Sequence, residues 1–189
     1  MNAADVAKAP RELHSERLVL HAPKAEFAPL FFESLTLSLP GLGYISWGQK
    51  APTLEWAEKF MLGGLKWIDA GDCLIFYAFE KTTGAYVGRV DLHSWDFEAP
   101  RCEVGYVGDV RTAGKGLMRE AVLACVDLAF SLGAVRVQAL SEASNHHALK
   151  FAEHALGFTR EGVLRNFERD AQGNLGEQVM FATYKAGAV

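Results

Sequence analysis

The sequence lacks most of the features that mark secreted, membrane and metal-stabilised proteins. Its 189 residues include only three cysteines, Cys73, Cys102 and Cys125, without any Cys-x-x-Cys spacing. That argues against a disulfide framework and a structural zinc site. No apolar run approaches the ~20 residues that span a bilayer, and no N-terminal stretch has the basic-then-apolar pattern of a signal peptide. We therefore expect a cytoplasmic protein with reduced thiols, no bound metal and no membrane partner.

The chain also has no excess of positive charge. Lysine and arginine number 19 against 23 aspartate and glutamate, which gives a formal net charge of −4. Binding to a nucleic-acid backbone relies on a basic face, so we expect no nucleic-acid partner. The hydrophobic share of 50% is ordinary for a globular chain, and the length suits one domain.

The order of apolar patterns predicts a mixed α/β (α+β) domain. Residues 1–13 are small and polar and are interpreted as a flexible N-terminal tail, followed by a single domain over 14–186. Helical spacing predicts helices at 26–39, 53–68, 117–132 and 145–156. Apolar runs predict strands at 18–20, 73–80, 85–95, 101–107, 134–140, from 157 onward, and at 178–184. Short turns between the three strands from 73 to 107 predict an antiparallel meander.

A glycine-rich turn, Arg111-Thr112-Ala113-Gly114-Lys115-Gly116, lies between the third meander strand and a long helix. The first N–H groups of a helix have no internal partner and its dipole is positive there, so this junction favours a phosphate or pyrophosphate. It is not a dinucleotide fingerprint, because Arg119 stands where the third glycine belongs. A GxxxxGK[ST] P-loop is absent. The turn alone also fits an ordinary strand-to-helix connection.

The pattern Arg-x-x-Gly-x-Gly at 111–116 matches the (Gln/Arg)-x-x-Gly-x-(Gly/Ala) signature of the GCN5-related N-acetyltransferase (GNAT) superfamily. Further segments resemble its ribosomal-protein N-terminal acetyltransferase (RimJ/RimL-like) branch, at 17–20, 88–90, 103–106, 116–122, Asn145 and 156–165. The resemblance runs in order from about Ser15 to Tyr184. It implies the GNAT fold, a mostly antiparallel, splayed sheet of about six to seven strands flanked by about four helices.

The resemblance implies acetyl-CoA as co-substrate, lying where two central strands diverge, with its pyrophosphate on the glycine turn. The positions implied to bind it are Val107, Arg111, Thr112, Ala113, Gly114, Lys115, Gly116, Leu117, Met118 and Asn145. Val107 would pair with the pantetheine arm. Lys115 fits a phosphate contact and a solvated lysine equally well, and Asn145 also suits a helix N-cap.

Acetyl transfer to an amine requires that a proton leave the amine and that the thioester carbonyl be polarised. Glu103 matches a position where related enzymes carry a catalytic glutamate, so it is our candidate general base. The alternative is an ion pair with Arg101 or Arg89. Tyr106, three residues further on, should point to the opposite face of a regular strand.

The acceptor site implied by the resemblance would be walled by Trp47, His93, Trp95 and Tyr106. Aromatic walls can hold a peptide N-terminus or an aliphatic amine through packing and cation–π contact. Core packing is the alternative for Trp95. The expected function is an N-acetyltransferase that modifies a protein N-terminus or a small-molecule amine, and family analogy allows a homodimer.

The chain departs from the family at the usual general acids. Ala148 and Ala152 occupy the positions of the serine and tyrosine that protonate the leaving thiolate elsewhere in the superfamily. His146 or His147 could take that role, or no protein acid is needed. The spacing from Asn145 to Gly157 is one residue longer than typical, which predicts a bulged helix. The missing acid leaves open a non-catalytic acyl-CoA-binding sensor.

Overall fold

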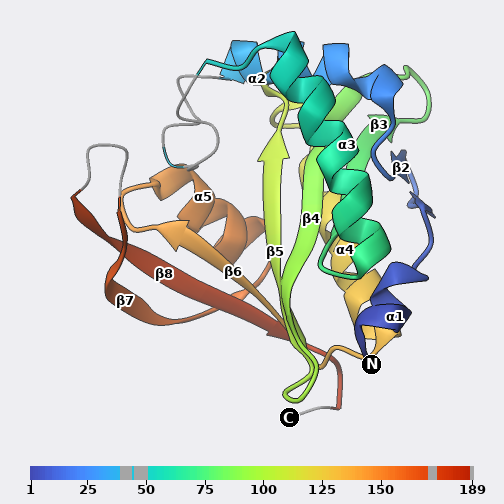
Figure 1. The fold of residues 1–189 in the computed structure, drawn as a ribbon. Coiled ribbons are helices and arrows are strands. Elements are labelled where there is room, and N and C mark those ends of the chain that lie inside the picture. Colours follow the sequence, from blue (N-terminus) through green and yellow to red (C-terminus); the bar gives the residue numbers. More distant parts are fainter. Residues whose placement is uncertain (39–43, 45–50, 170–173, 188–189) are drawn as a thin grey trace.

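The computed structural model describes residues 1–38, 44, 51–169 and 174–187. One sheet has α3 in front of it and α4 behind it (Figure 1). The elements are α1 (Ala3–Ala7), β1 (Glu12–His14), β2 (Leu18–His21), α2 (Ala28–Ser38), α3 (Leu54–Ala70), β3 (Leu74–Glu80), β4 (Tyr86–Asp96), β5 (Arg101–Gly108), α4 (Leu117–Leu132), β6 (Arg136–Glu142), α5 (His146–Lys150), β7 (Thr159–Arg169) and β8 (Leu175–Tyr184). In these ranges no helix is long and apolar enough to cross a bilayer.

The eight strands lie in the order β1-β2-β3-β4-β5-β6-β8-β7. Every neighbouring pair is antiparallel except β5 and β6. The mixed, mostly antiparallel fold and the β3-β4-β5 meander are therefore confirmed. The described residues contain one strand and one α-helix more than predicted: α1 lies within residues 1–13, and β1 begins in that segment and ends at His14.

Residues 1–13 are not the flexible tail that their composition suggested. Asn2 caps α1, and its side chain and that of Asp5 form a capping box. Val6 is fully buried, and β1 pairs with β2, with Leu13 opposite Leu20. Elements of five and three residues are too short to show a periodic pattern. They are ordered because they pack against the rest of the domain.

The helix after Asn145 is bulged, as its length predicted. α5 covers His146–Lys150 and continues directly as a π-helical turn over Phe151–Ala155. A π-turn accommodates one extra residue in an α-helix without breaking it. The additional residue between Asn145 and Gly157 is thus absorbed inside the helix.

The sheet splits between its two central strands. β5 and β6 pair only over Arg101–Glu103 and Arg136–Gln138, although β5 runs on to Gly108 and β6 to Glu142. Figure 1 shows β6 and β8 swinging away from β5 beyond this point. One backbone edge of β5 therefore has no neighbouring strand in the described sheet, and an extended ligand can lie against it.

The first turn of α4 packs closely on the two strands at the open end of the split. A Cβ at Gly88 would lie 2.5 Å from the Val107 carbonyl oxygen and 2.7 Å from the Met118 sulfur. Any larger residue at this position would force the strand or the helix to move. Gly88 thereby brings the start of α4, and the glycine turn before it, against the strand edge.

Candidate active site

A cavity of about 880 Å³ lies at the split of the sheet. Side chains from α3, β3, β4 and β5 line one part of it, and β6, α5, β7 and β8 line the rest. Glu103 and Tyr106 both line it, although they leave β5 on opposite faces. The divergence of the strands makes this arrangement possible, because the gap opens through the sheet.

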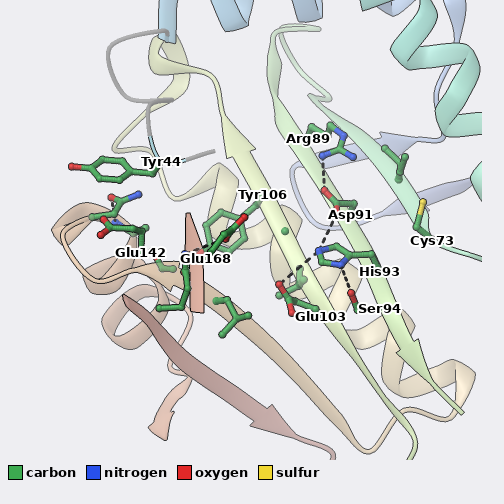
Figure 2. Close-up of a pocket in the computed structure, with 18 of the residues that line it drawn as sticks. Tyr44, Cys73, Arg89, Asp91, His93, Ser94, Glu103, Tyr106, Glu142 and Glu168 are labelled. Carbon is green, nitrogen blue, oxygen red and sulfur yellow. Dashed lines mark hydrogen bonds and ion pairs between the residues drawn. The ribbon is translucent and has the colours of Figure 1, made fainter. Parts of the chain in front are cut away.

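A row of charged side chains runs along β4 into this cavity (Figure 2). Arg89 and Asp91 are buried and form an ion pair of 2.5 Å. His93 Nε2 lies 3.5 Å from Asp91 Oδ2, and Nδ1 lies 2.9 Å from the Ser94 hydroxyl. Our sequence reasoning named His93 but missed Arg89 and Asp91 as its neighbours. The two-residue alternation of a strand, which puts positions 89, 91 and 93 on one face, could have identified them.

Glu103 faces this row from β5, and only 18% of its side chain is exposed. Its Oε1 lies 3.9 Å from His93 Nε2, and its Oε2 accepts a hydrogen bond of 3.3 Å from Gln138 Nε2. Arg101, one expected structural partner, pairs instead with Asp96 at 3.2 Å. The Glu103 carboxylate is thus not neutralised by either arginine named as its alternative partner.

Burial raises the pKa of Glu103 above its ordinary value. The charge of His93 and the hydrogen bond from Gln138 act in the opposite direction, and the nearby carboxylates of Asp91 and Glu168 add to the rise. Proton transfer is most efficient when the pKa of the base approaches the working pH. The environment therefore shifts Glu103 toward the range that suits a general base.

The raised pKa has a consequence for stability that Glu103→Gln will reveal. When the pKa of a carboxyl is higher in the folded state than in the unfolded state, the free energy of unfolding falls as the pH rises through the interval between the two pKa values. We expect the variant to melt roughly 1–4 °C above the wild type at pH 7. The difference should shrink toward pH 4, where Glu103 is protonated in the folded wild type.

Glu161→Gln supplies a control of opposite sign for these melting curves. Hydrogen bonds from Arg136 and Tyr184 lower the pKa of Glu161 to about 2. Its charged form therefore stabilises the fold above the unfolded pKa, and that contribution is lost as the pH falls toward 2. This variant should melt below the wild type at pH 7. Equal melting temperatures for Glu103→Gln and the wild type at pH 7 and pH 4 would contradict the raised pKa.

The glycine turn is held from behind by Asp109, whose carboxylate is buried. It accepts hydrogen bonds from the backbone amide of Arg111 at 2.8 Å and from the guanidinium of the same residue at 2.6 Å. The guanidinium also reaches Glu33 on α2 at 3.0 Å. These hydrogen bonds, first that to Asp109, raise the pKa of Arg111. The Arg111 side chain thus fixes the turn to the body of the domain.

The backbone amides of the turn fall into two groups. Thr112 donates to the carbonyl of Asp109, and Ala113 donates to the carbonyl of Val110. Among the described residues, the amides of Gly114, Lys115 and Gly116 have no acceptor. Gly114 and Gly116 have φ of +78° and +74°, a region that other residues adopt at a cost. Of the six turn residues at 111–116, these three keep their amides available for a ligand.

The remaining predicted cofactor positions lie around the split. Val107 is on the part of β5 beyond its last pair with β6. Leu117 and Met118 form the first turn of α4. Asn145 lines the cavity and also caps α5, since its side chain accepts a hydrogen bond of 3.1 Å from the Ala148 amide. Both interpretations of Asn145 are thus compatible with its position.

The predicted acceptor wall is only partly assembled. His93 and Tyr106 line the cavity, and the ring of Tyr106 packs against Phe151 at 5.2 Å. Trp95 does not line it and packs against the core instead. A bulge in β4 after His93, where Ser94 has φ of +52°, breaks the regular alternation of the strand before Trp95, and core packing was the alternative stated for this residue. Trp47 lies outside the described residues.

The cavity offers few groups that could protonate a thiolate. Ala148 lines it and Ala152 is buried, whereas His146 and His147 are exposed and lie outside its lining. Burial raises the pKa of Tyr106 to about 12, so its hydroxyl stays protonated near neutral pH. Tyr106 is thus one of the hydroxyl groups that line the cavity, together with those of Tyr44, Ser94 and Ser141.

The cysteines and metal-binding side chains point to no other chemistry. All three cysteines are free and buried, and burial raises the pKa of Cys73 and Cys102 to about 12. A thiol with such a pKa is a poor nucleophile near neutral pH. Within the part of the chain that the structure describes, no three His, Cys, Asp or Glu side chains form a group that could hold a metal ion.

Comparison with known proteins identifies the family and agrees with the fold. The family model described as "Acetyltransferase (GNAT) domain" matches residues 17–159, so the chain belongs to the GNAT acetyltransferase family. An uncharacterized N-acetyltransferase, p20, from Bacillus licheniformis is 34% identical over 111 residues. That match covers 58% of this chain and 61% of the relative, which is less than two thirds of the relative's length.

Two solved structures are similar over nearly their whole length. The microcin C7 self-immunity acetyltransferase MccE, in complex with acetyl-CoA and AMP, has a TM-score of 0.83 at 18% identity, over 95% of this chain and 99% of that one. RimL, a ribosomal L7/L12 α-N-protein acetyltransferase in complex with coenzyme A, has a TM-score of 0.79 at 19% identity, over 93% and 97%. At these identities the likeness establishes the fold. The resemblance to the GNAT superfamily is confirmed, and RimL represents the branch that the sequence resembles.

Proposed function

We propose that the protein is an acetyl-CoA-dependent N-acetyltransferase that acts on a primary amine, with Glu103 as the general base. One observation carries the proposal above all. A largely buried carboxylate, that of Glu103, faces the cavity at the split of the sheet. The same split ends beside a glycine turn whose last three amides have no acceptor among the described residues. An anion site and a base thus lie along one opening.

The residues available fit acetyl-CoA as co-substrate. The amides of Gly114, Lys115 and Gly116 stand at the positive end of α4 and suit a pyrophosphate. Beyond Glu103, the edge of β5 that faces the split has no neighbouring strand in the described sheet, and it suits the amide groups of a pantetheine arm. Bound there, acetyl-CoA supplies the activated acetyl group.

Glu103 would act on the acceptor amine. Its ionised carboxylate takes a proton from the ammonium, directly or through a water, and the neutral amine can then attack the thioester carbonyl. The new N–C bond forms as the C–S bond breaks, and the electron pair leaves with the sulfur. The proton that the attacking nitrogen then loses passes, directly or through a water, to the thiolate and gives the free CoA thiol. Gln138 fixes the orientation of the Glu103 carboxylate. His93 lies beside Glu103 and can accept the proton that Glu103 has taken from the ammonium.

The acceptor is proposed to be a protein N-terminus or a small amine. RimL, named for its action on a ribosomal protein, supports the first, and the breadth of chemistry that one fold can host supports the second. The aromatic rings of Tyr44, Phe60, Trp67 and Phe167 line the cavity with the carboxylates. Such a lining favours a positively charged amine attached to an apolar body.

Calorimetric titration with acetyl-CoA, followed by a free-thiol assay, tests the proposal. The amine panel comprises peptides that begin with Ser, Ala or Met, together with simple aliphatic amines. We expect binding, and release of free CoA thiol with one acceptor class. Binding without release on any acceptor would favour a non-catalytic acyl-CoA sensor. The alanines at positions 148 and 152, where a general acid was expected, are compatible with that alternative. Absence of binding would refute the proposed cofactor site.

A further inference from the structure

Arg17, at the approach to β2, reaches across the molecule to the glycine turn. Its NH1 donates a hydrogen bond of 3.0 Å to the backbone carbonyl of Lys115. Its NH2 lies 3.7 Å from the point where a Cβ would stand on Gly116. The two segments are 98 residues apart in sequence, so only the fold brings them together.

This contact fixes the orientation of one particular peptide plane. The carbonyl of Lys115 and the amide of Gly116 belong to the same peptide unit, and in a planar trans peptide they point in opposite directions. No peptide bond among the described residues is cis. Because Arg17 holds the carbonyl on its own side, the N–H of Gly116 points away from Arg17, toward the open side of the turn.

Arg17 is itself held in place by Glu120 on the first turns of α4. The carboxylate of Glu120 accepts hydrogen bonds of 2.7 Å from the Arg17 backbone amide, from its Nε, and from the Ser15 hydroxyl. Burial opposes ionisation, but these hydrogen bonds lower the pKa of Glu120 overall. Two hydrogen bonds to one carboxylate, one from the backbone amide and a charge-assisted one from Nε, together with that from NH1 to Lys115, restrict the orientation of the guanidinium.

We propose that Arg17, anchored by Glu120, is a positioning residue for the cofactor. It holds the Lys115–Gly116 peptide so that the Gly116 amide faces the pyrophosphate of acetyl-CoA. This role rests on the proposed function, because it requires that acetyl-CoA bind with its pyrophosphate at the glycine turn. It also gives the Arg17-Leu18-Val19-Leu20 segment a function beyond that of an ordinary strand.

The test compares Arg17→Ala with Arg11→Ala. Arg11 makes the same two kinds of contact as Arg17, since it donates to a backbone carbonyl, that of Ala7, and to a carboxylate, that of Asp69, which is more exposed than Glu120. Its side chain is 43% exposed, against 46% for Arg17. It makes no hydrogen bond to the glycine turn. Both variants lose an exposed arginine, but only one of them releases the peptide at Gly116.

We expect Arg17→Ala to weaken acetyl-CoA binding about tenfold in calorimetric titration, the scale of one charge-assisted hydrogen bond. Arg11→Ala should bind as the wild type does. Arg17→Ala should lose slightly more thermal stability than Arg11→Ala, because Glu120 is more buried than Asp69. Arg17→Lys should recover part of the affinity, because a lysine can donate to the carbonyl but has no second group, like Nε of Arg17, that donates to Glu120 at the same time.

The amide resonance of Gly116 in ¹⁵N-labelled protein separates positioning from general loosening. It should shift strongly when CoA is added to the wild type and to Arg11→Ala, and much less with Arg17→Ala. Equal affinities and equal shifts in wild type and Arg17→Ala would overturn the inference. So would a loss of affinity accompanied by a far larger drop in melting temperature than in Arg11→Ala. A wild type that does not bind acetyl-CoA would refute the proposed function instead.

Discussion

Glu103→Gln is expected to lower the rate of acetyl transfer by about 10²–10⁴-fold, the range that a positioned general base contributes. Glutamine has the shape of glutamate and can keep the hydrogen bond to Gln138 by rotating its amide, but it cannot accept a proton from an ammonium. Acetyl-CoA affinity should stay within about twofold of the wild type, because the amides proposed to hold the pyrophosphate belong to the glycine turn. The loss should therefore appear in kcat and leave cofactor binding intact.

The pH profile gives the same prediction a second readout. A base must be unprotonated to act, so kcat/KM in the wild type rises with pH as Glu103 loses its proton. Because burial raises the pKa of Glu103, this rise should be centred above the pH expected for an ordinary glutamate. The Gln variant should lose that limb and keep only the one that belongs to the acceptor amine.

Glu98→Gln is the matched control for these measurements. Glu98 lies in the turn between β4 and β5, exposed to solvent and outside the cavity, so the substitution removes the same charge from the same hairpin. Its rate and pH profile should equal those of the wild type. Rates for Glu103→Gln that also match the wild type would rule out Glu103 as an essential base.

Gly116→Ala should weaken acetyl-CoA binding about tenfold or more. Gly116 has φ of +74° at the N-cap of α4, and a residue with a Cβ there costs about 1–2 kcal/mol. The backbone can relieve this strain by rotating φ, which turns the amides of Gly116 and Leu117 away from a shared anion. Titration calorimetry with acetyl-CoA measures the change directly.

Gly84→Ala provides the control, because Gly84 has nearly the same φ, +70°, in the turn between β3 and β4. A Cβ there would meet nothing within 4 Å, so the substitution adds the same backbone strain away from the cavity. Both variants should melt roughly 2–5 °C below the wild type. Only Gly116→Ala should lose affinity. Comparable losses in both variants would mean that the turn responds to overall stability and has no specific role in binding.

The elements near the active site were readable from the sequence because their signals are local. Three signals each act over only a few residues: the alternation of the strands, the short turns of the meander, and the glycines at 114 and 116 before a long apolar helix. The extra residue between Asn145 and Gly157 was also visible in the spacing, and it appears as the π-turn. Local propensity and global fold agree at these places, so one chain sufficed to predict them.

Residues 1–13 and the surroundings of Trp95 could not be predicted in the same way. α1 is stabilised through Val6, which is buried against the rest of the domain, and the composition of the segment alone resembles a tail. The bulge at Ser94 alters the direction of the following side chains. Periodicity assumes a regular strand and cannot detect such a shift.

By itself, the sequence determined the order of the elements, the GNAT class of the fold, the glycine turn and the candidate base Glu103. Tertiary structure decided which groups surround that base, since His93, Gln138 and Asp91 reach it from different positions along β4 and β6. It also decided which amides of the turn remain available and brought Arg17 to the carbonyl of Lys115. The physical reason is the sequence separation over which each interaction acts. Turn chemistry and periodicity act over a few residues, whereas burial, charge coupling and the hydrogen bond of Arg17 depend on groups that meet only when the chain folds.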